Sequence, residues 1–481
     1  MSDATPPAPG PTATPEPGSS LTAPSVTGLE LQAEAPRRQV ISWALWDWAT
    51  QPFNSVIITF VFTALYLTRD AFLAPEVAAL PADDPVHERA LAGLSSGLGL
   101  WITISGILIA VLAPVLGQRA DVDGRRKAWL GGSTIALVAC MFALFFVRAD
   151  PAYFVLGAVL IALGSVASEI AGVNYNALLV HVSTAKTVGR VSGLGWGLGY
   201  TGGILALVIV VVADRFDWFG LPTDDGLPFR VIAVGCAIWA IAFGWPVFKY
   251  VPEAPPAADR PRVGLVEGYK VLGRDVVDLY RNARTTFWFL LASAVYRDGL
   301  AGVFTFGAII AGVSFGFSDQ GVVIFGIAAN LVAGASTMLA GRLDDKIGPF
   351  KVIIGSLVGL VVAGAVVVAL HDLGQMVFWI AGLLLCCFVG PAQAASRSFL
   401  ARMTPAGRES EIFGLYAFTG RAASFLAPGL WTLIISLTHA TIWGTVGLIA
   451  VILAGLVLML ALVKPLQHDA AGTSAARQPQ P

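Results

Sequence analysis

Twelve apolar runs constrain what this chain can fold into more than any other feature of its sequence. A run of about 20 apolar residues is the length that a helix needs to cross a bilayer. Backbone groups in lipid must be hydrogen-bonded within their own segment, so such runs predict membrane-spanning α-helices. The runs cover residues 41–68, 94–116, 128–147, 153–180, 191–213, 229–250, 285–312, 320–340, 350–370, 375–398, 411–437 and 441–463.

The scarcity of charge excludes a large soluble protein. Only 13% of the 481 residues are charged and 56% are hydrophobic, whereas soluble domains carry about 25% charged residues. The formal net charge of −1 provides no basic field for nucleic acid. The four cysteines lie inside apolar runs without metal-ligand spacing. The sequence therefore predicts an all-α polytopic membrane protein with no metal, no cofactor and no nucleic-acid partner.

A hydrophilic stretch, residues 251–284, divides the runs into two sets of six. The first 36 residues carry eight prolines and few large apolar side chains, which is typical of disordered tails. We expect a disordered Pro-rich cytoplasmic tail (1–36), a six-helix bundle (37–250), a cytoplasmic linker (251–284), a second six-helix bundle (285–464) and a second cytoplasmic tail (465–481).

The distribution of lysine and arginine predicts the orientation. With the N-terminus in the cytoplasm, 23 of the 30 basic residues fall in cytoplasmic segments, five fall in the opposite loops, and Arg297 and Arg421 remain inside runs. Cytoplasmic loops are enriched in Lys and Arg. Both termini are therefore predicted to face the cytoplasm, with the protein in the cytoplasmic (inner) membrane.

An internal repeat links the two halves. GQRADVDGRRK (117–127) and GRLDDKIGPFK (341–351) follow the second and eighth runs and share the pattern G-x3-D-x2-G followed by a base. Glycine permits tight turns and close helix approach, and a carboxylate at the end of one helix can stabilise the N-terminus of another. We predict that both segments are conformational hinge loops, with Gly117, Asp121, Gly124, Arg125, Arg126, Gly341, Asp345, Gly348 and Lys351 as their working residues.

Polar residues within the runs are candidates for a substrate or coupling cavity. A charge at the centre of a membrane helix costs about 2.5–3.5 kcal/mol, so it is usually functional and faces protein or water. Asp47 lies between tryptophans and could instead be an interfacial acid in an aromatic belt, and Arg421 could be a structural partner of an acid. A buried acid, Glu169 or Asp298, could carry a proton. The predicted cavity residues are Asp47, Gln51, Asn54, Glu169, Tyr175, Asn176, Trp196, Tyr200, Tyr296, Arg297, Asp298 and Arg421.

Arg297 and Asp298 are neighbours in the sequence, so their side chains point about 100° apart on a helix. Each therefore reaches a different partner, or the helix is broken at this point, as Gly299 and Gly302 would allow. Broken helices recur at transporter binding sites.

The two repeated segments resemble the signature loop of the major facilitator superfamily. That resemblance implies two six-helix bundles related by pseudo-two-fold symmetry, a central cavity and rocker-switch alternating access. Further strings resemble the vacuole-effluxer-like branch, also called the unknown major facilitator family, which includes fungal autophagy-related amino-acid exporters. These strings are WALWDWATQPF (43–53), NYNALL (174–179), GRVSGLGWGLGYTGG (189–203) and SRSFLARMTPAGRESEIFGLYAFTGRAASFLAP (396–428).

The sequence thus predicts a monomeric secondary active transporter of a small polar solute, with the bilayer, the solute and protons as its partners. The resemblance implies efflux of amino acids or related metabolites. Arginine suits a carboxylate because its guanidinium is permanently charged and bidentate, and Asp47 would suit an amine. Alternatives are a proton-coupled multidrug efflux pump, a membrane-embedded lipid enzyme, and a sensor or assembly protein without transport. Scattered acids disfavour the enzyme.

Overall fold

The computed structural model describes residues 27–30, 32–81, 84–222, 224–253 and 265–465. Twelve of its helical segments are long and apolar enough to cross a membrane, which confirms the predicted fold class. The first six are α1 with its π-helical continuation (Arg37–Leu67), α3 (Pro85–Asp123), α4 (Arg126–Ala143), α5 (Phe154–Ala177), α6 (Val188–Arg215) and α7 (Leu227–Tyr250).

The C-terminal half supplies the other six spans. They are α9 (Arg284–Ile309), α10 (Asp319–Ile347), α11 (Pro349–Ala369), α13 (Leu383–Met403), the broken span α14 (Glu409–Ala423) and α15 (Leu426–Thr438), and α16 (Gly444–Leu462). Short helices α2 (Pro75–Ala78) and α12 (Gln375–Val377) lie near span ends. The predicted tails fall largely outside the described residues, at 1–26 and 466–481.

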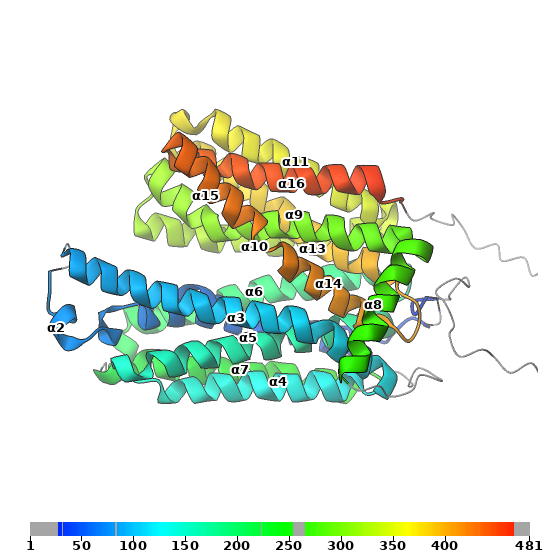
Figure 1. Ribbon diagram of the computed structural model, residues 1–481, viewed down its shortest axis with the longest axis horizontal. Helices are drawn as coiled ribbons and strands as arrows, with labels where there is room; N and C mark the ends of the chain where they lie inside the picture. Colours follow the sequence, from blue (N-terminus) through cyan, green and yellow to red (C-terminus); the bar gives the residue numbers. More distant parts are fainter. Residues whose placement is uncertain (1–26, 31, 82–83, 223, 254–264, 466–481) are drawn as a thin grey trace, which may run out of the picture.

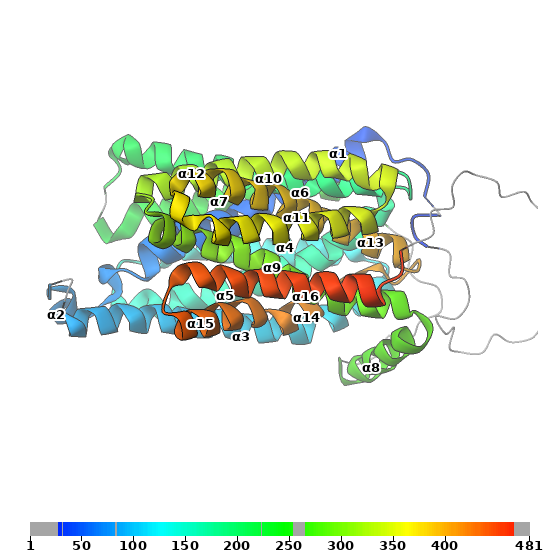
Figure 2. The ribbon, with the colours of Figure 1, turned by 90° about the horizontal axis from the view of Figure 1, so that it is seen from above.

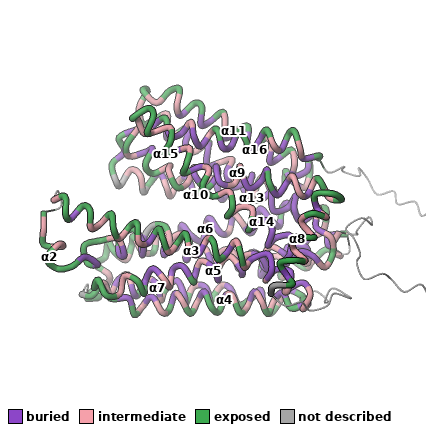
Figure 3. The backbone as a smooth tube through the Cα atoms, in the orientation of Figure 1, coloured by how far each residue is buried: buried purple, intermediate pink, exposed green. Residues whose placement is uncertain are grey.

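The two halves lie side by side and approach each other at one end. Helix α3 packs along α14, and α6 packs along α10, while α5 also contacts α14 and α13 also contacts α6. Figure 1 shows the halves close together near α8 and α14 and diverging toward α2 and α15. Figure 3 shows buried residues gathered at the end where the halves meet.

Three local features differ from the sequence expectations. The two predicted hinge loops (117–127 and 341–351) are mostly helical, because α3 continues to Asp123 and α10 to Ile347. The predicted linker contains an unforeseen helix, α8 (Leu265–Asn282), which lies across the end of the spans in Figures 1 and 2. Span 7 is unbroken over Arg284–Ile309, whereas span 11 is interrupted between α14 and α15.

Candidate functional site

A buried arginine joins the two halves inside the molecule. Arg397 on α13 is 4% exposed, and its Nη1 lies 3.3 Å from Asp47 Oδ2 on α1. The same Nη1 donates to Asn176 Oδ1 on α5 at 3.1 Å, and Nη2 donates to the backbone carbonyl oxygen of Ser192 on α6 at 2.6 Å. One side chain of the C-terminal half therefore contacts three helices of the N-terminal half.

Tyr175 supports this cluster from within the N-terminal half. Its hydroxyl donates to Asp47 Oδ2 at 2.9 Å. Its ring is stacked between Trp43 and Trp46, with centroids 4.5 Å away on both sides. Both tryptophans are buried. They therefore pack inside the protein and do not form the lipid-facing aromatic belt that the sequence left open as an alternative for Asp47.

A second ion pair crosses between the halves. Arg421 Nη2 on α14 donates to Glu169 Oε2 on α5 at 2.9 Å. Unlike Arg397, both side chains remain open to solvent, at 41% and 30% exposure respectively. Each residue lies 12 positions, or about 18 Å, from the end where the halves meet, counted from Glu409 and His181. The pair is thus a solvent-accessible polar site deep between the halves.

The neighbouring residues Arg297 and Asp298 reach different partners, as their angular separation on an unbroken helix requires. Arg297 Nη1 donates to the backbone carbonyl oxygen of Tyr416 at 3.1 Å, and its guanidinium lies 3.7 Å from the centre of that ring. The fully buried Tyr296 shares a hydrogen bond of 2.6 Å with the Ser396 hydroxyl. Arg297 and Tyr296 therefore connect α9 to α14 and α13, two other helices of its own half.

Asp298 caps the interrupted span. Its Oδ2 accepts a hydrogen bond of 2.5 Å from the backbone N–H of Ala427, in the first turn of α15. The first N–H groups of a helix have no partner within the helix, and a carboxylate there also stabilises the helix dipole. Asp298 therefore stabilises the point at which α15 begins, whereas Arg421 pairs with Glu169.

The remaining cavity candidates occupy several environments. Gln51 is half-buried and Asn54 is exposed, within span 1. Tyr200 is buried on α6, and its ring stacks on Phe304 of the other half with centroids 6.0 Å apart. Trp196 lies beside Arg397, whose guanidinium carbon is 5.6 Å from the centroid of the Trp196 ring. Trp196 Nε1 is buried with no hydrogen-bond partner among the described residues.

The first inter-half contact is made by the end of α3 and the start of α14. Asp121 accepts backbone hydrogen bonds from Ser410 at 3.1 Å and from Glu411 at 2.8 Å. Gly117 lies so close that an added Cβ would stand 2.2 Å from the Ser410 carbonyl oxygen. The chain reverses at Gly124, whose φ is +61°. A carboxylate of one half thus caps a helix of the other.

A buried arginine reinforces the first contact. Arg126 is 2% exposed, and its Nε donates to Asp121 Oδ1 at 2.7 Å. Its Nη2 donates to Glu409 of the other half, and its Nη1 lies 2.7 Å from His181 Nε2. Arg125, by contrast, is exposed at the turn. Arg126 is therefore the base of the repeat that connects acids from both halves.

The second inter-half contact repeats this backbone arrangement with the halves exchanged. Asp345 on α10 accepts hydrogen bonds from the backbone N–H groups of Gly189 at 2.7 Å and Arg190 at 3.0 Å, in the first turn of α6. A Cβ added to Gly341 would lie 2.6 Å from the Gly189 carbonyl oxygen. Gly348 forms the turn at φ +90°. The two copies of the sequence repeat therefore form the same contact, in which a carboxylate caps a helix of the other half.

The base at the second contact is not the one that the repeat suggested. Arg402 of α13 pairs with Asp344 at 2.5 Å and Asp345 at 3.4 Å. Lys351 is exposed on α11. Asp344 is 1% exposed and also accepts from the Ser398 hydroxyl. The charged pairing at this contact therefore lies within the C-terminal half.

A short segment before α1, the N-terminal strap (residues 27–30 and 32–35), covers the first contact. Thr27 forms a bridge with Pro405 of the C-terminal half. Leu29 is 2% exposed within the core. A Cβ added to Gly28 would lie 2.6 Å from Glu409 Oε1. Gln32 contacts His181 of the N-terminal half at 3.4 Å. The described part of the predicted tail is therefore packed against both halves.

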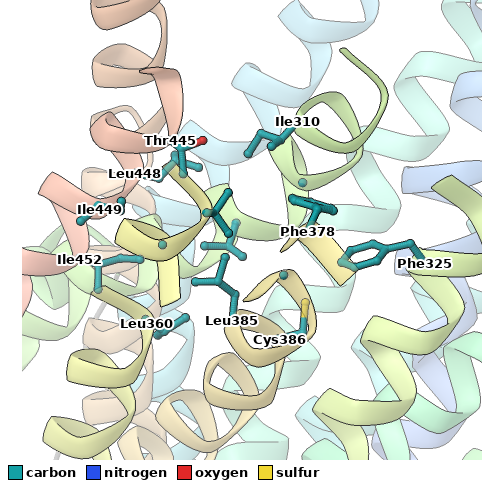
Figure 4. A pocket seen from close by; sticks show the side chains of 15 residues that line it. Ile310, Phe325, Leu360, Phe378, Leu385, Cys386, Thr445, Leu448, Ile449 and Ile452 are labelled. Carbon is teal, nitrogen blue, oxygen red and sulfur yellow. The ribbon is translucent and has the colours of Figure 1, made fainter. Parts of the chain in front are cut away.

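An apolar pocket lies inside the C-terminal half, between α9, α10, α11, α13 and α16 (Figure 4). Its lining includes Phe325, Phe378 and Leu385, and its polar member Thr445 has a buried hydroxyl without a partner in the described structure. Across the described ranges, no group of three or more His, Cys, Asp or Glu could hold a metal ion. The residues that line the pocket are all uncharged, so the charged cavity candidates lie outside it.

Sequence reasoning missed four residues of these networks: Asp344, Arg397, Arg402 and Glu409. Arg397 was counted with the cytoplasmic bases because it comes at the edge of an apolar run, yet it lies within α13 and is buried. The small residues before it and the apolar residues after it, from Ala392 to Ala401, are a signal that could have placed it inside the helix. The partners of Glu409 are too distant in sequence for such a signal.

Residues 180–465 match the family model described as "Vacuole effluxer Atg22 like". The chain is 27% identical over 429 residues to the "Uncharacterized MFS-type transporter YxiO" of Bacillus subtilis, covering 88% of this chain and 94% of that protein. It is 25% identical over 293 residues to Autophagy-related protein 22 of Cryptococcus neoformans, covering 54% of this chain. The match spans 52% of that fungal relative's length.

Solved structures of the major facilitator superfamily share the fold. The human organic anion transporter MFSD10 aligns with a TM-score of 0.67 at 15% identity, covering 88% of this chain and 100% of that chain. The proton:xylose symporter XylE aligns with a TM-score of 0.66 at 12% identity, covering 88% and 94%. The protein is a multi-pass membrane transporter and not an enzyme, and it belongs to the Atg22-like vacuole effluxer family of the major facilitator superfamily.

Proposed function

We propose that this chain is a monomeric secondary active transporter that exports amino acids or related small polar metabolites by alternating access, coupled to protons. The distribution of Lys and Arg supports a cytoplasmic-membrane location with both termini in the cytoplasm. The effluxer family supports the direction. In this orientation the two inter-half contacts lie at the cytoplasmic end.

The two inter-half contacts act as the cytoplasmic gate in this proposal. Each is built from a carboxylate that caps a helix of the opposite half. The capping hydrogen bonds at both contacts must therefore break when the halves rotate apart. Because the halves meet at this end and diverge at the other, the structure corresponds to an outward-facing state (Figure 1). Hydrogen bonds of the carboxylates to the starts of α14 and α6 would then be exchanged for water during each cycle.

The Glu169–Arg421 ion pair carries the substrate assignment. It joins the halves, and both partners remain partly exposed to solvent. A zwitterionic solute offers a carboxylate to the guanidinium and an ammonium group to the carboxylate, so it competes for both partners of the pair. Arginine binds carboxylates with bidentate geometry. Substrate would thus replace a contact between the halves with a contact to each half.

The other charged candidates receive different roles. Asp47 is engaged by Tyr175 and Arg397, so we assign recognition of the amine to Glu169 and not to Asp47. The Arg397 cluster holds the halves together on the gate side of the substrate. Arg297 and Asp298 shape α14 and α15, and thereby position Arg421.

Proton coupling is assigned to Glu169. Protonation would remove the negative charge that binds the ammonium group, so proton and substrate compete for this carboxylate, as the exchange of an entering proton for an exported substrate requires. Asp298 is a poorer proton carrier in this scheme because its oxygen already accepts a helix N–H group. Multidrug efflux is the weaker alternative, since the apolar pocket lies within one half and not between the halves.

Thermal unfolding of the purified protein against a library of amino acids, sugars and hydrophobic amines tests the proposal. A ligand that binds the folded state raises the melting temperature. We expect an amino acid to stabilise the protein, and Arg421→Ala or Glu169→Gln to weaken its binding about 10-fold or more, as for loss of a hydrogen bond between charged groups. Arg215→Ala, at an exposed span end, is the matched control.

Two outcomes would contradict these assignments. Unchanged binding of the stabilising amino acid in both variants would remove the ion pair from the substrate site. In proteoliposomes, substrate-induced pH changes that persist in Glu169→Gln would remove the proton-coupling role. Stabilisation by hydrophobic amines alone would favour the multidrug alternative.

A further inference from the structure

Helix α8 is tied to both halves along its inner face. The Tyr269 hydroxyl donates to the Val111 carbonyl oxygen on α3 at 2.7 Å. Asp275 lies 3.1 Å from Arg408, between α13 and α14. Leu279 is 2% exposed in the core. Burial alone would lower the pKa of Arg408, but hydrogen bonding and the charges of Glu411 and Asp275 raise it above its ordinary value. The anchor is therefore permanently charged.

The outer face of α8 carries a basic stripe, bordered on one side by Glu267 and Asp278, which lie about 20° and 40° beyond Arg274 around the helix. At 100° per residue, Lys270, Arg281 and Arg274 fall within an arc of about 40°. All three side chains are exposed. No acid is paired with any of them in the part of the chain that the structure describes. Figure 2 shows that α8 juts from the bundle, and the exposure of all three side chains places the stripe on the solvent side of this helix.

Aromatic residues on one flank of the stripe indicate the depth of the helix. Tyr269 and Tyr280 are 38% and 47% exposed. The Tyr280 ring lies 5.2 Å from Phe287 and 6.4 Å from Trp288, centroid to centroid, in the first turns of α9. Tyrosine and tryptophan concentrate at the level of lipid headgroups. Since α9 is a membrane span, this aromatic cluster places α8 at the interface.

We propose that the outer face of α8 is a docking surface for anionic phospholipid headgroups. Three bases within one arc offer a cluster of positive charge to a headgroup phosphate, while the tyrosines on the flank extend into the interface. Basic clusters beside cytoplasmic span ends bind anionic lipids in this way. The choice of leaflet rests on the proposed orientation, whereas binding itself requires neither the transport direction nor the substrate.

Native mass spectrometry of the full chain in detergent tests the surface with phosphatidylglycerol, phosphatidylcholine and inorganic phosphate as probes. Each base contributes about fivefold to the affinity for an anionic membrane surface. Lys270→Gln/Arg274→Gln/Arg281→Gln should therefore weaken phosphatidylglycerol binding about 100-fold. The control Arg37→Gln/Lys186→Gln/Lys346→Gln removes the same charge from exposed positions elsewhere at this end and should stay within about fivefold of the wild type.

A charge-conserving variant, Lys270→Arg/Arg274→Lys/Arg281→Lys, separates lost charge from lost folding and should retain binding. Phosphatidylglycerol binding that survives the glutamine variant, or falls equally in the control, would overturn the proposal. Displacement of the lipid by equimolar inorganic phosphate would identify a free-anion site, and displacement by an acidic peptide would identify a protein partner. Either result would also overturn it. A failed transport assay would leave these binding results unchanged.

Discussion

The two inter-half contacts use one backbone device with two different charge arrangements. Asp121 bonds to the second and third N–H groups of α14, and Asp345 bonds to the second and third N–H groups of α6. At the first contact, Arg126 joins acids from both halves and every charged side chain is buried. At the second, Arg402 pairs with two acids of its own half, and Asp345 is 11% exposed.

This difference has a physical consequence. Separating the first contact requires an ion pair between the halves to be broken as well as the helix cap, whereas the second loses mainly the cap. Breaking a buried ion pair costs about 3–5 kcal/mol because the remaining charge is left without a partner. Equivalent substitutions at the two contacts can therefore measure the difference between their free energies.

The largest effect is expected from Asp121→Asn. Loss of its charge leaves Arg126 with Glu409 alone and weakens the cap of α14, so the first contact should lose about 3–4 kcal/mol. Hydrogen exchange at Ser410 and Glu411 should then accelerate by about two orders of magnitude. Asp345→Asn, followed at Gly189 and Arg190, should cost about 1 kcal/mol. Equal acceleration in both variants would contradict the asymmetry.

The second prediction concerns which base serves the second contact. Arg402→Gln should destabilise it by about 2–3 kcal/mol because two neighbouring acids lose their partner. Lys351→Gln should change stability by less than about 0.5 kcal/mol, since this side chain is exposed. Thermal unfolding measures both. If Lys351→Gln lowers the melting temperature more than Arg402→Gln does, the base that stabilises this contact is Lys351, as the repeat predicts, and not Arg402.

The N-terminal strap packs its buried Leu29 near the first contact and reaches the second only through the exposed ion pair of Glu34 with Arg190 at 2.9 Å, which gives a third comparison. Leu29→Ala removes a fully buried side chain, which should cost about 2 kcal/mol. Limited proteolysis should then cut between the strap and α1 faster than in the wild type. Ile41→Ala, at an exposed position of α1, is the control. Unchanged cleavage in Leu29→Ala would mean that the strap is not stabilised by its packing.

The sequence predicts the elements that depend on local chemistry. Twelve spans follow from hydrophobic length, and the repeat locates both Asp121 and Asp345 at span ends. The backbone groups that these residues bind could not be predicted, because Ser410 lies 289 positions from Asp121 and Gly189 lies 156 positions from Asp345, and no local pattern relates them. Helix α8 was missed because it is amphipathic and shorter than a span. Pro428, which lacks an N–H group, is the local signal for the break in span 11 that was overlooked.

Asp298 extends the comparison to a third capped helix, within the membrane span. It caps α15 as Asp121 caps α14, but it lies in the same half as its helix and forms no ion pair with any residue that the structure describes. The cap alone should be worth about 1 kcal/mol. Asp298→Ala should therefore destabilise the protein by that amount and accelerate hydrogen exchange at Ala427 about fivefold. Asp298→Asn, which keeps an acceptor oxygen, should lose less. A cost of several kcal/mol in Asp298→Asn would show that the charge, and not the hydrogen bond, stabilises the break, and Asp298 would then resemble Asp121 more closely than its location suggests.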